Sequence, residues 1–209
     1  MVLSDKEIRD RCLSYQKYSM DAPLIEPFVE DQLQGASYDV TISNIIYTFK
    51  SEFQTIDIAE QDNIDSIYQE IDISDGYCIA PGQYILVTLN EKINVPKDLV
   101  AGLRPRTRFV RLGINVSDQH VNPLSTAILK IGIQNCTAYA INIYPNIGIG
   151  QLLFETLSSE PSENKLYKTK KGANYSQDIN FVGSKLSDEL KTQVNREYEN
   201  LLKNMFKGD

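Results

Sequence analysis

The chain has 209 residues, of which 42% are hydrophobic and 23% charged, and its formal net charge is -7 at pH 7. This length and composition are sufficient for one domain that folds without disulfides or a structural metal. The acidic balance argues against a nucleic-acid-binding protein, because phosphate contacts need clustered Lys and Arg.

The cysteines and the first residues restrict the compartment and the metal chemistry. Cys12, Cys78 and Cys136 are widely separated and form no C-x-x-C pair, so they suit neither a disulfide framework nor a zinc site. The opening residues MVLSDKEIRD carry charges where a signal peptide needs an apolar run. No stretch approaches the ~20 apolar residues of a membrane span. We therefore expect a cytoplasmic protein without zinc and without membrane association.

The N-terminus is predicted to form a short helix. Ser4 and Glu7 have the S-x-x-E spacing of a capping box, in which each residue bonds a backbone N–H of the other. The helix should run to about Leu13, with Ile8 and Cys12 on its buried face.

The middle of the chain is predicted to form an all-β sandwich or barrel. Short runs rich in β-forming residues lie at 38–42, 84–89, 127–133, 140–144 and 150–154. Turn-forming residues separate the runs, namely Pro81-Gly82, Asn90, Pro96, Pro123, Asn135 and Pro145-Asn146. The acidic stretch from Glu52 to Asp75 is expected to be a solvated excursion at the domain edge, with a partner-docking loop as the alternative.

The C-terminal part is predicted to hold an arm and a helix. The polar segment 158–186 has little periodicity and is typical of a mobile arm or lid. Ser187 is a candidate N-cap for an amphipathic helix over 187–209. The apolar stripe of that helix would pack on its own domain, on a second copy or on a partner. We accordingly expect a domain over 1–186 and a helical extension over 187–209.

A cluster of arginines stands out in this acidic protein. Arg104, Arg106, Arg108 and Arg111 lie within eight residues. Converging guanidinium groups can hold a triphosphate, because each presents a planar fork of donors. The alternative is a surface strip that pairs with the abundant Asp and Glu. Composition alone leaves both open.

Several segments, in order, resemble the dCTP deaminase and dUTPase superfamily, most closely dCTP deaminase. They are LSDKEI at 3–8, IEPF at 25–28, QLQGASYDV at 32–40, PG at 81–82 with VTL at 87–89 and VP at 95–96, RTRFVRLGI at 106–114, IGQLLFE at 149–155, and Tyr167 with ANYSQ at 173–177. The resemblance covers nearly all of the chain to about residue 186.

The resemblance implies a fold, an assembly and a set of binding residues. The fold would be a distorted jelly roll or β-barrel of the dUTPase-like type, assembled as a homotrimer with active sites between subunits. A pyrimidine deoxynucleoside triphosphate would bind as its magnesium complex, and the only Mg²⁺ would enter with it. The implied nucleotide-binding residues are Arg106, Thr107, Arg108, Arg111, Asn122, Gln151, Tyr167, Tyr175 and Gln177.

The sequence departs from the family where the family carries its catalytic carboxylates. Pro123 and Asn135 set the register, which places Gly132 at the position of the deaminase glutamate and Asn122 at that of an aspartate beside the sugar. Between residues 119 and 154 the chain has no Asp or Glu. Glycine cannot transfer protons and an amide is a very poor base, so no catalytic residue is assigned.

Three functions follow from this pattern. The first is a nucleotide-binding trimer that has lost its chemistry and acts as a sensor, sponge or regulator. The second is an active dCTP deaminase with a rearranged site, using His120, the only histidine, or a carboxylate from elsewhere in the trimer. The third is a scaffold that binds partners through its C-terminal helix. Lys130, on the same strand face as Gly132, would add a positive contact or, less readily, a base.

Overall fold

The computed structural model describes residues 1–52, 55–169, 175, 179–186, 193 and 196–198. The chain divides into two compact units, one of residues 1–48 and 70–181 and one of residues 49–69 and 182–209. Most of the predicted helix over 187–209 lies outside the described residues, and of that range residues 193 and 196–198 are helical. The domain boundary at 186 stays a prediction.

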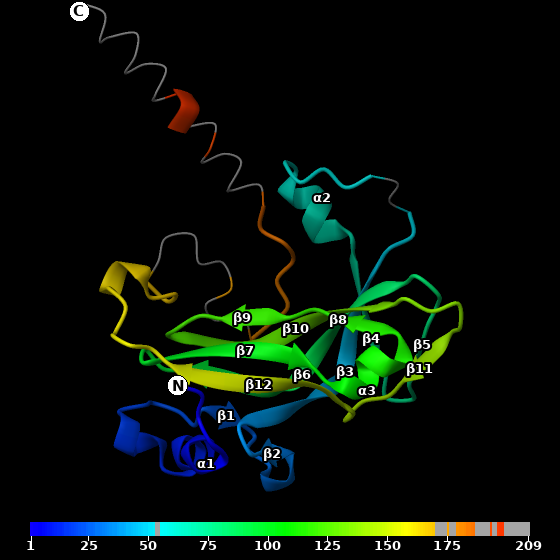
Figure 1. The fold of residues 1–209 in the computed structure, drawn as a ribbon. Helices are drawn as coiled ribbons and strands as arrows, with labels where there is room; N and C mark the ends of the chain where they lie inside the picture. The colour runs from blue at the N-terminus through cyan, green and yellow to red at the C-terminus, as the bar shows by residue number, and fades with distance from the viewer. Residues whose placement is uncertain (53–54, 170–174, 176–178, 187–192, 194–195, 199–209) are drawn as a thin grey trace, which may run out of the picture. The chain divides into compact units, whose positions relative to one another are not determined.

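The first unit is built from β-strands, as expected. The strands are β1 Ile25–Glu26, β2 Leu33–Gln34, β3 Ser37–Phe49, β4 Tyr68–Asp72, β5 Tyr77–Ile79, β6 Tyr84–Val95, β7 Leu99–Pro105, β8 Ile114–Val116, β9 Gln119–Val121, β10 Ser125–Asn135, β11 Ile141–Ile143 and β12 Gly148–Thr156. The main sheet has the order β8-β10-β6-β3-β12-β7-β9, with β1 on β6 and both β2 and β4 on β3, and β5 pairs with β11 separately (Figure 1).

The connection between β9 and β10 closes the sheet on itself. These strands lie at or next to opposite ends of the sheet order, yet only residues 122–124 separate them in the chain. Three residues span about 10 Å at most, so the two ends of the sheet must approach each other. The sheet therefore curls around a core that includes Tyr38 and Phe154, both fully buried.

One turn prediction was wrong. Asn90 lies inside β6, where its side-chain amide donates to the Thr41 hydroxyl, to the Ile42 carbonyl and to Asn146. Asn135 ends β10 as predicted, and its Oδ1 accepts from the Thr137 backbone N–H at 3.0 Å. The turn at Pro145-Asn146 is confirmed, with Asn146 at a φ of 64°.

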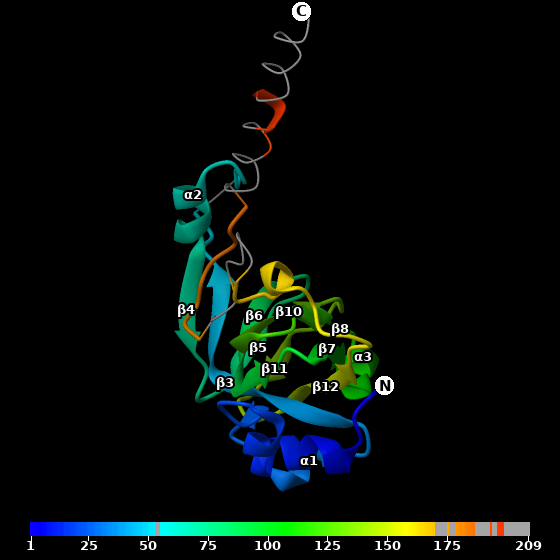
Figure 2. The ribbon, with the colours of Figure 1, turned by 90° about the vertical axis from the view of Figure 1, so that its left-hand side faces the viewer.

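The predicted N-terminal helix is confirmed as α1, Asp5–Leu13. The Ser4 backbone N–H donates to Glu7 Oε2 at 2.8 Å, which lowers the pKa of the Glu7 carboxyl. Ile8 and Cys12 are buried, and α1 lies beside β2 (Figures 1 and 2). The remaining helices are α2 Gln61–Ser66, α3 Thr107–Leu112 and the 3-10 turns Tyr15–Tyr18, Glu30–Gln32 and Glu163–Lys165.

The cysteines are expected to differ in reactivity. Burial raises the pKa of Cys12 to about 12, whereas Cys78 and Cys136 are exposed. Because the thiolate is the reactive form, a disulfide reagent at pH 8 should label Cys78 and Cys136 quickly and Cys12 only after unfolding. Mass spectrometry of the labelled peptides checks this order, and rapid labelling of Cys12 in the folded protein would contradict it.

The second unit contains the acidic stretch. Residues 55–60 are exposed, as expected for a solvated excursion, but α2 follows and buries Ile64 to 2%. Lys185 Nζ pairs with the Asp65 carboxylate at 3.1 Å within this unit. No helix in the part of the chain that the structure describes is long and apolar enough to span a membrane.

Candidate functional site

A buried carboxylate brings two of the predicted binding residues together. Asp39 on β3 is 6% exposed, and Gln151 on β12 lies opposite it in the strand register. Gln151 Nε2 donates to Asp39 Oδ1 at 3.1 Å, and Arg106 Nη2 lies 3.4 Å from Asp39 Oδ2. Gln34 Nε2 donates to the second oxygen at 3.4 Å. Asp39 therefore orients the Arg106 guanidinium and the Gln151 amide toward one point.

A glycine makes room for the Arg106 side chain. Arg106 is the N-cap of α3, in an extended conformation, and its side chain is 25% exposed. A Cβ added at Gly148 of β12 would lie 2.3 Å from Arg106 Nη1. Any larger residue at position 148 would therefore push the guanidinium away from Asp39.

The predicted phosphate loop is a short helix. Residues Thr107–Leu112 form α3, which Phe109 anchors in the core at 8% exposure, and Gly113 ends it at a φ of 83°. Arg108 and Arg111 are three residues apart, so their exposed side chains share one side of the helix. Within the described residues, neither forms an ion pair.

The arginines of the cluster have different partners, which bears on whether they form an anion pocket or a surface strip that pairs with Asp and Glu. Arg104 Nη1 pairs with Asp118 Oδ2 at 2.7 Å, and both side chains are more than half exposed. This pair fits the surface-strip reading, and such exposed pairs contribute little to stability. Arg106 instead pairs with the buried Asp39, and the anion pocket stays a prediction.

The arm meets the connection between β9 and β10. The Tyr167 backbone N–H donates to the Pro123 carbonyl at 3.3 Å, next to the half-buried Asn122. Tyr175 is half-buried, and Gln177 lies outside the described residues. The Tyr167 bond thus places the arm beside Asn122, whereas the ion pair of Arg106 and the hydrogen bond of Gln151 meet at Asp39.

Gly132 does not border open space. A Cβ built on Gly132 would lie 1.9 Å from Tyr84 Oη, 2.7 Å from Tyr84 Cζ and 2.9 Å from Ser117 Oγ. The Ser117 backbone N–H donates to the Gly132 carbonyl at 2.8 Å, which fixes that segment against β10. The tyrosine hydroxyl therefore occupies the place where a side chain at position 132 would begin.

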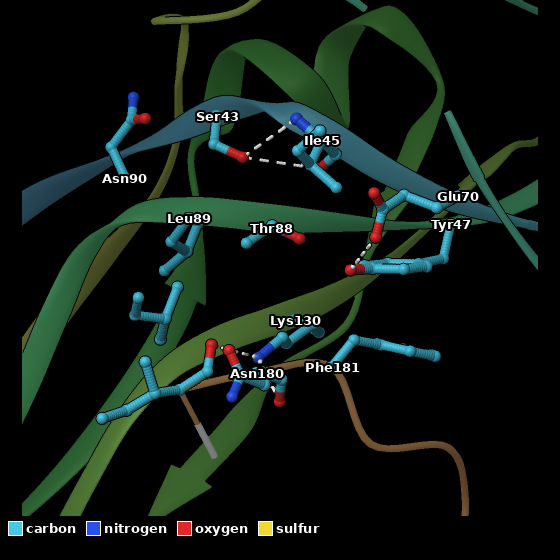
Figure 3. Close-up of a pocket in the computed structure, with 12 residues that line it drawn as sticks. Ser43, Ile45, Tyr47, Glu70, Thr88, Leu89, Asn90, Lys130, Asn180 and Phe181 are labelled. Atoms are coloured by element: carbon cyan, nitrogen blue, oxygen red, sulfur yellow. Dashed lines mark hydrogen bonds between the residues drawn. The ribbon is translucent and has the colours of Figure 1, made fainter. Parts of the chain in front are cut away.

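A pocket of about 610 Å³ lies on the face of β10 that carries Lys130 (Figure 3). Tyr47 stacks on Phe181 with 3.7 Å between ring centroids, and its hydroxyl donates to Glu70. Thr88 Oγ1 lines the pocket and is the buried side-chain atom, among the described residues, without a hydrogen-bond partner. Lys130 Nζ donates to the carbonyls of Ile179 and Asn180, so its ammonium contacts the C-terminal part of the arm.

Comparison with known proteins decides the family. The family model described as dCTP deaminase-like matches residues 2–157. This chain belongs to the dCTP deaminase-like family. Two similar relatives, each named "dCTP deaminase, dUMP-forming", come from Dictyoglomus turgidum and Methanothermobacter thermautotrophicus. The first is 30% identical and covers 90% of this chain and 95% of the relative, and the second is 29% identical and covers 93% and 98%.

A solved structure of a deaminase shares the fold. The crystal structure of 2'-deoxycytidine 5'-triphosphate deaminase from Agrobacterium tumefaciens superposes with a TM-score of 0.59 at 22% identity. The match covers 74% of this chain and 48% of that one, so the chain spans about half of that structure's length. The predicted dUTPase-like β fold is confirmed.

The site in this member of the dCTP deaminase-like family includes residues that the sequence did not single out. Asp39 lies inside the segment 32–40 that resembles the family, and this resemblance is the sequence feature that points to it. No local pattern marks Tyr84, Ser117 or Gly148, because each of them contacts a residue far away in the chain. His120 is exposed on β9, opposite Gly102 of β7.

The described residues offer no metal cluster of their own. Among them, no group of three or more His, Cys, Asp or Glu side chains is arranged to hold a metal ion. The donors gathered around Asp39 are nitrogen groups of Arg106, Gln151 and Gln34, which suit anions rather than cations.

Proposed function

We propose that this family member binds a pyrimidine deoxynucleoside triphosphate as a cytoplasmic homotrimer, does not deaminate it, and acts as a nucleotide sensor, sponge or regulator. The observation that carries the proposal is a contrast between two positions. Arg106 and Gln151 are oriented by the buried Asp39, whereas the Tyr84 hydroxyl covers a glycine where the family carries its general base. Groups for binding are present and the group for proton transfer is missing.

The phosphates would bind at Arg106, Gln151 and the exposed face of α3. The Arg106 guanidinium is partly shielded from water, which strengthens its attraction for an anion. Asp39 compensates a single positive charge, so Arg108 and Arg111 leave the site positive. Such forks of donors match phosphate oxygens. Mg²⁺ would accompany the nucleotide, and a chelator should weaken nucleotide binding if that complex is the ligand.

Loss of the carboxylate removes the proton transfers of deamination. Water attacking the pyrimidine must give up a proton and the leaving nitrogen must gain one, and a positioned acid–base group contributes ~10²–10⁴-fold to such steps. Gly132 contributes no side chain, and the atoms nearest to its missing Cβ belong to two hydroxyl-bearing residues, Tyr84 and Ser117. Asn122 offers an amide at the second family carboxylate position, and an amide is a hydrogen-bonding group rather than a base.

The trimer is proposed from the family resemblance and has a direct test. One chain has a mass of 23.7 kDa, so the assembly should be about 71 kDa by light scattering after size exclusion. Tyr167 and Tyr175 would complete each site from the arm. A purely monomeric protein at micromolar concentration would contradict the assembly.

Binding and turnover must be measured on the same sample. Isothermal titration with dCTP, dUTP and dTTP in Mg²⁺ should give binding to at least one of them. Incubation with dCTP should release no ammonia, and incubation with dUTP no pyrophosphate, at the 1–10³ s⁻¹ of ordinary enzymes. Turnover at such rates would reject the proposal, and so would failure to bind any of the three.

The second candidate is an active dCTP deaminase with a rearranged site. Relatives at 30% identity over 90% of the chain are named dCTP deaminases, which favours it. His120 is the titratable group on β9, the strand that leads into the Asn122 connection. If it were the base, His120→Ala would abolish ammonia release, and an unchanged rate would exclude this role. The partner-binding scaffold rests on residues 187–209, which lie largely outside the described residues.

A further inference from the structure

We propose that the Tyr84 hydroxyl replaces the side chain missing at Gly132 and contacts the heterocycle of the bound pyrimidine nucleotide. The inference rests on the proposed nucleotide binding. It assigns the base-contacting role to Tyr84 of β6, a residue outside the segments that carry the family resemblance.

The strand register places Tyr84 on the same face as Gly132. In the β6–β10 ladder Tyr84 pairs with Gln134, and Gly132 pairs with Leu86. Residues two apart on a strand share a face, so Tyr84 and Gly132 are diagonal neighbours across the two strands. An aromatic side chain reaches such a neighbour, and here Tyr84 Oη lies 1.9 Å from the Cβ point of Gly132.

Covering a glycine with an aromatic ring is a known way to stabilise a strand, but it does not require the hydroxyl. At Gly132 the nearest atom is the oxygen, followed by Cζ, so the polar end of Tyr84 lies over the glycine and not the ring face. Phenylalanine would cover the strand as well. Tyr84 is 38% exposed, so part of this residue is in contact with solvent.

A second hydroxyl converges on the same point from another segment. Ser117 Oγ lies 2.9 Å from the Cβ point of Gly132, and the Ser117 N–H bond to the Gly132 carbonyl holds it there. The position that resembles the family's carboxylate site is thus formed by neutral groups from β6 and from the residue after β8. None of these groups comes from β10 itself.

The change from carboxylate to hydroxyl alters which bases fit. An ionised carboxylate only accepts hydrogen bonds, whereas a hydroxyl both donates and accepts. Tyr84 can therefore donate to the 4-carbonyl of a uracil ring and accept from the 4-amino group of a cytosine ring. The ligand class is accordingly pyrimidine nucleotides of both kinds, with little discrimination between them.

The test uses the full chain with dCTP, dUTP and inorganic tripolyphosphate, each with Mg²⁺. Tyr84→Phe should weaken both nucleotides about 3- to 10-fold, the range of one net hydrogen bond, and leave tripolyphosphate affinity unchanged. Tyr139→Phe, at a side chain that is 79% exposed, is the matched control and should change none of the three. A thermal melt should give the same midpoint for Tyr84→Phe as for the wild type.

The two ways of failing are distinct. If the wild type binds nucleotides but Tyr84→Phe binds them equally well, the role of Tyr84 is rejected and the proposed function stands. If the wild type binds neither nucleotide, both are rejected together. Loss of tripolyphosphate binding in Tyr84→Phe would also reject the inference, because it would place Tyr84 with the phosphates.

A second pair of variants tests the contact itself. Gly132→Ala should lower the melting temperature and weaken nucleotide binding, since its Cβ would overlap Tyr84 Oη. In a Tyr84→Ala background the same substitution should have a much smaller effect on the melting temperature. Equal effects in the two backgrounds would show that Tyr84 does not occupy this position.

Discussion

Replacing Arg106 by alanine is expected to weaken deoxynucleoside triphosphate binding on the order of 100-fold, because each hydrogen bond to a charged group is worth roughly 1.5–3 kcal/mol. Arg106 is the guanidinium that Asp39 orients and that lies beside the Gln151 amide. Arg106→Lys keeps a charge next to Asp39 but loses the planar fork, so its affinity should fall by a smaller factor. Isothermal titration measures both.

Two neighbouring variants serve as controls for Arg106. Arg104→Ala removes an arginine that pairs with the exposed Asp118 and not with Asp39, so its affinity should stay within about 2-fold of the wild type. Gly148→Ala retains Arg106 but displaces its guanidinium, so binding should weaken with little loss of stability. Equal losses for Arg104→Ala and Arg106→Ala would mean that a general positive field, rather than a built site, binds the phosphates.

Removing the buried Glu91 carboxylate should destabilise the fold by about 2–4 kcal/mol, since an unsatisfied buried polar group costs roughly 1–3 kcal/mol. Glu91 on β6 is 2% exposed. It accepts bonds from the Thr41 backbone N–H, the Thr41 hydroxyl and the Gln32 amide at 2.7–2.9 Å. Glu91→Ala leaves all three donors without their acceptor, and the melting temperature should fall by about 6–15 °C.

A matched exposed residue separates burial from charge in that experiment. Glu155 on β12 is exposed, so Glu155→Ala should change stability by no more than about 0.5 kcal/mol. Glu91→Gln keeps one acceptor oxygen and should lie between the two. Chemical denaturation of the three variants gives the order, and a similar loss for Glu155→Ala and Glu91→Ala would contradict the structural role of the Glu91 bonds.

The parts of the fold that depend on local chemistry were predictable from the sequence. The Ser4–Glu7 spacing predicts the start of α1, and runs rich in β-forming residues predict the cores of β6, β10 and β12. Asparagine favours turns, so the sequence predicts a turn at Asn90, but the bonds from its amide to Thr41, Ile42 and Asn146 keep this residue within β6. At Asn90, tertiary hydrogen bonds outweigh the local preference of asparagine for turns.

The candidate site was predictable only in part, for the same reason. The resemblance of motifs identifies Arg106 and Gln151 as site residues. Both contact Asp39, and Asp39 and Gln151 lie 112 positions apart in the chain. The hydroxyl over Gly132 comes from Tyr84 on a neighbouring strand, and the register of β6 against β10 determines that contact. The sequence pattern shows that position 132 is a glycine, but it does not show that Tyr84 occupies the space beside it.

The short connection from β9 to β10 brings two edges of the curled sheet together in a seam. Among the described residues, the Gln119 side chain bridges this seam, since Gln119 Nε2 donates to the Lys130 carbonyl at 2.6 Å. A seam held by a side chain opens at a lower free energy than a continuous ladder of backbone bonds. A ligand that binds along this seam would bind only the closed form of the sheet. It should therefore slow hydrogen exchange on β9 and β10 and stabilise the whole fold.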